Sequence, residues 1–410
     1  MLFLRRFVPG YDLLSIHNIR WLVISRLLAD LFFYSTTIVL FQRQRGLDFT
    51  QMFLMESIIS ATVWLFDIPT GAWADRFGYR RLILAGRVLN VLGLVLFVFA
   101  YGFWLFALSN VLAGLAIACI SGCESAMVYS SVPDKGKRHQ ATSAFVLLGA
   151  ASNIGLFVGL LTGSFIGAYS PMLAVAVSIV PGVLALLAAL RLRPQARAIS
   201  LATEKKPVNM LILVQNAFSI IRTQPVLVGL SFFDSAAFAF INAVFWYNQP
   251  YFLRAGIAVV WFGPLMAAAM GLKIVVGLRL PAIQSRLGMR LTLALSCAIP
   301  GIAYVLLAFS HFAVFTVLLV ALIVIFAVWR QPIVQAELNH LIPNESRATT
   351  LSSLSFLGAL AGIALNPLIG RVGDLGLEVT GVGIGLGLLV ICVMVPFVTL
   401  KMKTAMGHRT

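Results

Sequence analysis

Long apolar runs, separated by short polar or Gly- and Pro-containing connections, recur along the whole chain. A run of 18 or more mainly apolar residues is long enough to cross a bilayer as an α-helix. The pattern therefore predicts an all-α membrane protein with twelve transmembrane spans. The spans are residues 20–42, 51–72, 82–101, 104–131, 141–168, 171–192, 224–247, 258–280, 291–309, 313–337, 348–371 and 380–400.

Composition agrees with this prediction and excludes a soluble protein. Of the 410 residues 60% are hydrophobic and only 11% are charged, which leaves too little polar surface for a chain dispersed in water. The four cysteines lie inside apolar runs and have neither disulfide nor zinc-ligand spacing, so we expect no metal and no cofactor. The formal net charge of +16 would suit nucleic acid, but the placement of the basic residues gives it another meaning.

The Lys and Arg residues gather in every second connection. If the N-terminus is cytoplasmic, the inside segments hold 22 of the 30 basic residues and the outside connections hold four. Cytoplasmic loops of membrane proteins are enriched in Lys and Arg, so this distribution predicts that both termini are cytoplasmic. The charge then reflects contact with the lipid bilayer, and we expect no nucleic-acid partner.

The longest polar connection, residues 193–223, divides the spans six and six. It predicts a cytoplasmic linker between an N-terminal half, residues 1–192, and a C-terminal half, residues 224–410. The basic character of this connection suits a segment that lies along an anionic inner leaflet.

The two halves share short segments at an offset of 210 residues. "GAWADRFGYRR" (71–81) aligns with "PAIQSRLGMRL" (281–291), so that Gly78 meets Gly288. "VPDKGKRHQAT" and "IPNESRAT" align at the same offset. The common register indicates a duplicated six-helix unit.

Twelve spans, a basic central connection and "GAWADRFGYRR" between spans 2 and 3 resemble the major facilitator superfamily. Its signature at this place is G-x-x-x-D-R-x-G-R-[RK], and Tyr79 is one extra residue before the Arg pair. The preceding "DIPTGAWADRFG" is similar to drug-efflux-like bacterial members. The matching residues are Gly71, Asp75, Arg76, Gly78, Arg80 and Arg81.

This resemblance implies two six-helix pseudo-repeats that work by alternating access. It also implies that Asp75 and the Arg residues of the loop form a latch that holds the halves closed on the cytoplasmic side. A carboxylate is favoured at a helix N-terminus, and Gly71 and Gly78 allow close approach and a tight turn. The alternative is a solvated basic loop that only obeys the positive-inside rule.

Two features depart from many proton-driven exporters of the superfamily. Asn110 stands where they carry an Arg in span 4 before Gly114, and span 5 lacks their Gly-Pro pair. Gly155, Gly159 and Gly163 instead recur every four residues in span 5, which we interpret as tight helix packing.

Spans 1, 4, 7 and 10 each contain an ionisable residue at a similar depth: Asp30, Glu124, Asp234 and Arg330. They lie about seven to ten residues from the cytoplasmic ends, hence roughly 10–15 Å into the bilayer. Ionisable residues in spans are costly and mark functional sites, and the resemblance implies that these four spans line a central cavity. We therefore expect a site for a small-molecule substrate and protons at this depth.

In span 1, Arg26 and Asp30 are four residues apart and share one helix face. They form either a mutually neutralising pair or a carboxylate whose protonation is coupled to substrate. Glu124 has no cation near it in sequence. We expect it to be unpaired and to carry protons, with a neutral acid hydrogen-bonded to a neighbouring helix as the alternative.

Arg330 either binds an anionic group of the substrate or pairs with an acid, and we favour pairing. The acids considered are Asp234, Glu124 and Glu337. Arg87 in span 3 is also expected to pair with an acid elsewhere in the bundle.

Span 7 is rich in aromatic residues, which pack against lipid or form a cavity wall for amphipathic compounds. We select Phe238 and Phe240 as wall candidates, and Tyr34 in span 1 as a cavity candidate. Glu56 in span 2 is a further proton-coupling candidate near the cavity mouth.

No P-loop and no H-E-x-x-H motif occurs, so neither an ATP-driven pump nor a metalloenzyme is predicted. We predict a secondary active transporter, not an enzyme, that exports small amphipathic compounds by proton coupling. Proton-coupled uptake and organic-anion transport stay open as alternatives. We expect a monomer in the bacterial cytoplasmic membrane.

Overall fold

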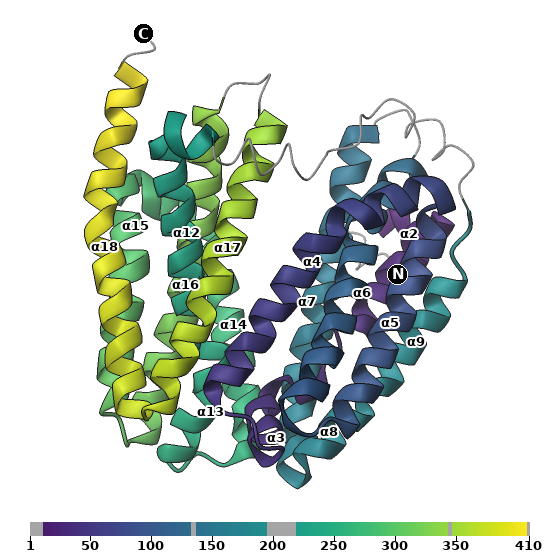
Figure 1. The fold of residues 1–410 in the computed structure, drawn as a ribbon, viewed down its shortest axis with the longest axis horizontal. Helices are drawn as coiled ribbons and strands as arrows, with labels where there is room; N and C mark the ends of the chain where they lie inside the picture. Colours follow the sequence, from purple (N-terminus) through teal and green to yellow (C-terminus); the bar gives the residue numbers. More distant parts are fainter. Residues whose placement is uncertain (1–10, 133–136, 195–218, 343–346, 408–410) are drawn as a thin grey trace. The chain divides into compact units, whose positions relative to one another are not determined.

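The structure is a computed structural model that describes residues 11–132, 137–194, 219–342 and 347–407 (Figure 1). Every regular element in these ranges is a helix, which confirms the all-α prediction. Most of the predicted linker, residues 195–218, lies outside the described residues.

Eleven described helices are long and apolar enough to cross a membrane. A twelfth span arises if the bent pair His17–Thr36 and Ile38–Gln44 is counted as one. Each predicted span overlaps one of these, so the prediction of twelve is confirmed with one correction. The first span is not a continuous helix, because its two parts meet at 59°.

The chain forms two compact units, and a short segment of the N-terminal half groups with the second unit. Unit 1 comprises Met1–Gly46 and Ile58–Pro207, and unit 2 comprises Leu47–Ser57 and Val208–Thr410. One boundary therefore falls inside a single helix, α4 (Phe49–Phe77), whose residues 49–57 pack with unit 2.

In unit 1, α2 packs against α7 and α9, and α5 packs against α6 (Figure 1). Besides most of α4, its elements are η1 (Tyr11–Ser15), α2 (His17–Ala29), η2 (Phe33–Thr36), α3 (Ile38–Gln44), α5 (Tyr79–Phe99), α6 (Gly102–Ser131), α7 (Lys137–Tyr169), α8 (Pro171–Val177) and α9 (Ile179–Leu190).

In unit 2, α15 packs against α16 and α18, and α12 packs against α17 (Figure 1). The elements are α12 (Pro225–Asn242), α13 (Val244–Arg254), η3 (Val259–Trp261), α14 (Phe262–Leu278), α15 (Leu280–Ala308), α16 (Ala313–Leu341), α17 (Arg347–Asp374) and α18 (Leu377–Gly407).

The backbone of the two units repeats at the offset of 210 residues that the sequence indicated. Gly78 has φ 88° and Gly288 has φ 75°, values in the left-handed region that glycine adopts without steric cost. A second pair at the same offset, Gly46 with φ 88° and Gly256 with φ 73°, was not predicted. Each pair makes the same turn in both units, which supports the duplication.

Span 1 loses its helical form where α7 presents its glycines. After Ala29 the chain continues irregularly and as the short 3-10 helix η2 before α3 begins. A Cβ at Gly159 would lie 2.9 Å from the carbonyl oxygen of Phe32, and one at Gly163 would overlap the carbonyl of Phe33. The prediction of tight packing by these glycines is confirmed: Gly155 meets the Leu27 carbonyl in the last turn of α2, and Gly159 and Gly163 meet the irregular backbone that follows it.

Polar groups on neighbouring elements satisfy part of this irregular backbone. The Phe33 amide donates to Ser178 Oγ at 3.1 Å, and Ser35 Oγ donates to the Phe32 carbonyl at 2.9 Å. Non-helical backbone at membrane depth is tolerated only where protein or water supplies such partners. The glycines of α7 let the same backbone pack closely against that helix.

We predict that Gly163→Ala lowers the stability of the protein by about 1–3 kcal/mol, because the added methyl group collides with the rigid Phe33 carbonyl. Thermal unfolding of the purified protein in detergent measures the loss. Gly149→Ala on the same helix is the matched control, since a Cβ there meets no atom within 4 Å. Equal losses in both variants would contradict the close-packing account.

Candidate functional site

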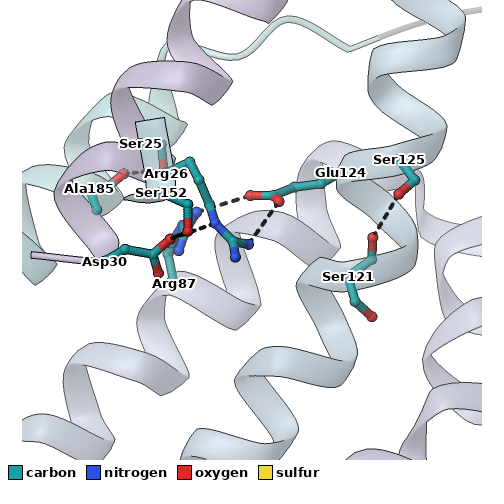
Figure 2. A network of polar contacts seen from close by, with 9 residues as sticks. All are labelled: Ser25, Arg26, Asp30, Arg87, Ser121, Glu124, Ser125, Ser152 and Ala185. Carbon is teal, nitrogen blue, oxygen red and sulfur yellow. Dashed lines mark hydrogen bonds and ion pairs between the residues drawn. The ribbon is translucent and has the colours of Figure 1, made fainter. Parts of the chain in front are cut away.

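Four charged side chains form one network inside unit 1, with Arg26 at its centre (Figure 2). Arg26 Nε lies 2.7 Å from Asp30 Oδ2, and Arg26 Nη1 lies 3.3 Å from Glu124 Oε2. The other oxygen of Glu124, Oε1, lies 3.1 Å from Arg87 Nη2. Two cations thus balance two carboxylates, which lowers the cost of placing charges in an apolar bundle.

The prediction that Glu124 is unpaired is therefore wrong. Its partners Arg26 and Arg87 belong to α2 and α5, far from Glu124 in sequence. The residues next to Glu124 in the sequence therefore could not predict these contacts. The expectation that Arg87 pairs with an acid is confirmed by the same contact. The side chains of Arg87 and Glu124 are only 5% and 9% exposed, so this pair is the most buried part of the network.

The end of α2 explains how Arg26 and Asp30 meet. Asp30 is the C-cap residue of α2, and its amide donates to the Arg26 carbonyl one turn earlier. Their side chains therefore lie on the same face, as the four-residue spacing predicted. Ser152 of α7 also donates its hydroxyl to Asp30 Oδ2 (Figure 2). Asp30 consequently has one cationic and one neutral donor.

Exposure separates Arg26 from the other members of the network. Its side chain is 36% exposed, against 19% for Asp30. If Arg26 turned away, Asp30 would keep the Ser152 hydroxyl and Glu124 would keep Arg87. Arg26 is thus an exposed cation whose departure leaves each carboxylate with a hydrogen-bond donor, whereas Arg87 is buried.

Unit 2 contains a simpler ion pair between α12 and α16. Arg330 Nη1 lies 2.7 Å from Asp234 Oδ1 and also donates to the Asp234 carbonyl. The pairing interpretation of Arg330 is confirmed. Its side chain is only 3% exposed, so it does not present an open cation to an anionic substrate. In each unit, an ion pair thus links the first span of the six-helix repeat to its fourth span.

The remaining cavity candidates lie in different surroundings. Tyr34 packs its ring against Phe97 with centroids 5.7 Å apart, and the Phe240 ring lies against Gly387 of α18. Both rings therefore fill contacts between helices of their own unit. Phe238 is 56% exposed and stays available as a wall residue. Glu56 is half-buried on α4, and none of the charged residues above contacts it within the described part of unit 2.

The loop between α4 and α5 is reduced to Gly78, whose positive φ makes the predicted tight turn. Arg80 does not extend from this loop. Its Nε donates to the Leu192 carbonyl at 2.6 Å and its Nη2 to the Leu190 carbonyl at 3.0 Å, so it caps the end of α9 inside unit 1. The contribution of Arg80 to the latch stays a prediction.

Asp75, Arg76 and Arg81 of the predicted latch are exposed, and Gly71 has open space where a Cβ would stand. Residues 74–81 line a pocket of about 350 Å³ together with Met127 and Pro194. The latch assigned to these residues stays a prediction.

Comparison with known proteins gives the same fold. The sequence model of the Major Facilitator Superfamily matches residues 21–365. The tetracycline resistance protein, class B, of Escherichia coli is 32% identical over 101 residues, 25% of this chain and 24% of that protein. The match thus spans about a quarter of the length of that relative.

Solved structures of transporters superpose on nearly the whole chain. A mutant of the nucleoside transporter NupG has a TM-score of 0.75 at 13% identity and covers 94% of this chain and 99% of its own. The peptide transporter POT in complex with sulfate has a TM-score of 0.71 at 16% identity and covers 95% of each chain. At such identities the likeness shows the fold alone.

We predict that Arg87→Met destabilises the protein by about 3 kcal/mol, because it leaves the buried Glu124 with a single cation. Adding Glu124→Met to that variant removes the matching negative charge and restores most of the stability. Unfolding of the detergent-solubilised single and double variants measures both effects. A double variant less stable than Arg87→Met would contradict the pairing.

Proposed function

The chain belongs to the major facilitator superfamily of transporters, and we propose that it exports small amphipathic compounds in exchange for protons. The observation that carries the proposal is the network of four charged side chains around Arg26, in which Asp30 has a single Arg partner and a second, neutral donor in Ser152. The transporter is expected to work as a monomer in the bacterial cytoplasmic membrane, with halves 1–192 and 224–410 alternating around the site.

Asp30 is the carboxylate that we assign to proton exchange. It is more exposed than Glu124, 19% against 9%, and it has one Arg partner where Glu124 has two. Protonation of Asp30 would release Arg26 while Ser152 continued to contact the carboxyl group. Glu124 then holds Arg87 in place through the cycle, which makes it a positioning residue.

Asp234 has a weaker claim to the same role. It is paired with Arg330, whose side chain is almost completely buried. Protonation of Asp234 would break its ion pair with Arg330. Arg330 would then be a buried cation without an anion, which is strongly unfavourable. We therefore assign the Asp234–Arg330 pair to holding α12 and α16 together.

Export is favoured over uptake by the short match to a protein named for tetracycline resistance, and by the "DIPTGAWADRFG" run. The apolar faces of the bundle and the exposed ring of Phe238 suit an amphipathic compound. Asp75, Arg76 and Arg81 would form the cytoplasmic latch that closes the inner side, with Arg80 holding their loop against α9.

A second function, transport of an organic anion, is favoured by one observation. Arg26 is the most exposed cation of the network, and an anionic group could replace Asp30 as its partner once Asp30 binds a proton. In that case proton and anion would bind together and move in the same direction. Arg330, which the sequence suggested for this role, is too enclosed to serve.

Inverted vesicles that hold an inside-acid pH gradient test the proposal. We expect amphipathic cations or neutral compounds to collapse part of the gradient with the wild-type protein. Asp30→Asn should abolish this response, because an amide cannot exchange the proton. Ser125→Ala, whose hydroxyl bonds only within α6, is a control that should keep it.

A response that persists in Asp30→Asn would contradict the assignment of the proton carrier. If organic anions instead move protons, and Arg26→Met abolishes that movement, the anion function replaces export. The abundance of each variant in the vesicles is measured alongside, so that loss of protein is not mistaken for loss of coupling.

A further inference from the structure

Lys273 of α14 is a cation inside unit 2 without an ion-pair partner among the described residues of that unit. It lies five residues before the helix ends at Leu278, about 7–8 Å along the axis, and its side chain is half-buried. It is the only polar side chain of the helix, "FGPLMAAAMGLKIVVGL". A charge in an apolar bundle is costly unless something neutralises it, so Lys273 requires an explanation.

The position of Lys273 on α14 directs it toward the bundle. Met266, two turns earlier, and Gly277, one turn later, share its helix face. Met266 is buried, and a Cβ at Gly277 would lie 3.3 Å from the Val328 side chain of α16. The exposed side chains near Lys273, such as Ile274, lie on other faces. A Lys on those faces could extend along lipid to the membrane surface, but Lys273 lies on the packed face.

The helix that Lys273 faces provides no acceptor side chain. α14 packs mainly against α16 (Figure 1). One span separates the two helices, so they run in the same direction, and the turns of α16 beside Lys273 are those before Val328. Residues 321–328, "ALIVIFAV", are all apolar. The next residue, Trp329, is buried and its Nε1 has no hydrogen-bond partner in the described part of the chain, so it adds a donor and not an acceptor.

The carboxylates of the neighbouring helices do not neutralise Lys273 either. α15, which also packs against α14, contains no Asp or Glu. Glu337 of α16 lies nine residues after Val328, about 13 Å further along that helix. Asp234 is already paired with Arg330 at 2.7 Å. The packing of α14 within unit 2 therefore gives Lys273 no counter-charge.

This separates Lys273 from the Arg residues inside the spans. Arg26, Arg87 and Arg330 each contact a carboxylate of their own unit. An anionic ligand would have to compete with that carboxylate for the guanidinium group. The Lys273 ammonium group has three N–H donors and no such competitor in unit 2.

We propose that Lys273 binds an anionic group of the transported compound. The inference rests on the proposed transport function and narrows its substrate class to amphipathic compounds that carry a carboxylate, sulfonate or phosphate group. Such a group accepts charge-assisted hydrogen bonds from the ammonium donors, and these are strong where water is scarce. The apolar residues of α14 and α16 beside Lys273 suit the rest of the molecule. A zwitterion meets this requirement and has no net charge.

Equilibrium dialysis of the purified full-length protein in phosphatidylcholine nanodiscs tests the proposal, with a naphthalene sulfonate as the probe. We expect saturable binding above that of empty nanodiscs, and much weaker binding of a naphthalene alcohol of similar size. Lys273→Met should weaken the affinity for the sulfonate about tenfold or more, the effect of losing one charge-assisted hydrogen bond. Lys273→Arg keeps the charge and should retain most of the affinity.

Arg279→Met is the matched control, because Arg279 is an exposed cation at the end of the same helix. This variant should bind the sulfonate as the wild type does. The proposal fails if the wild type does not bind the sulfonate saturably, or if Lys273→Met binds it equally well. It also fails if Arg279→Met loses as much affinity as Lys273→Met, since the effect would then reflect the charge of the whole helix.

Thermal unfolding without ligand decides whether Lys273 already has a carboxylate partner. Because Lys273→Met removes an unpaired cation from the bundle, its Tm should equal or exceed that of the wild type. A fall as large as that of Arg87→Met would mean that a carboxylate of unit 1 neutralises Lys273, and the proposal would be overturned. Neither measurement depends on Asp30, so sulfonate binding can fail while the proton response of the vesicles holds, and the reverse.

Discussion

The structure depends on one constraint, that a charge inside an apolar bundle must have a partner of opposite sign. Each unit meets it by joining a helix near its beginning to its fourth span: α2 to α6 through Arg26 and Glu124, and α12 to α16 through Asp234 and Arg330. A buried ion pair stabilises little by itself, but removing one partner is costly. The pairs therefore help to fix which helices are neighbours within each unit.

The two units meet this constraint differently, and the proposed site of proton coupling lies in the unit with the larger network. In unit 2 the Arg330 side chain is almost completely buried, and among the described residues its ion-pair partner is Asp234 alone. In unit 1 the same link is shared among four groups, and Arg26 can leave without stranding a carboxylate. The irregular backbone after Ala29 places Asp30 at a helix end, where the glycines of α7 and the hydroxyl of Ser152 support it.

The sequence predicts the features that depend on local pattern. Apolar runs place the spans, the four-residue spacing brings Arg26 to Asp30, and the aligned loops indicate that Gly78 and Gly288 make the same turn.

The sequence does not predict contacts that depend on tertiary packing. No cation stands in the same helix as Glu124, so its pairing with two Arg residues of other helices can be identified only from the structure. The break in span 1 follows apolar residues without Pro, and its signal is the run of glycines on a different helix.

The central claim is that Asp30, and not the more enclosed Glu124, exchanges the proton. Infrared difference spectroscopy of the purified protein between high and low pH detects the carbonyl stretch of a carboxyl group that gains a proton. The account predicts one such band that disappears in Asp30→Asn and persists in Glu124→Gln. A band that persists in Asp30→Asn and disappears in Glu124→Gln would contradict it and move proton exchange to the Arg87–Glu124 pair.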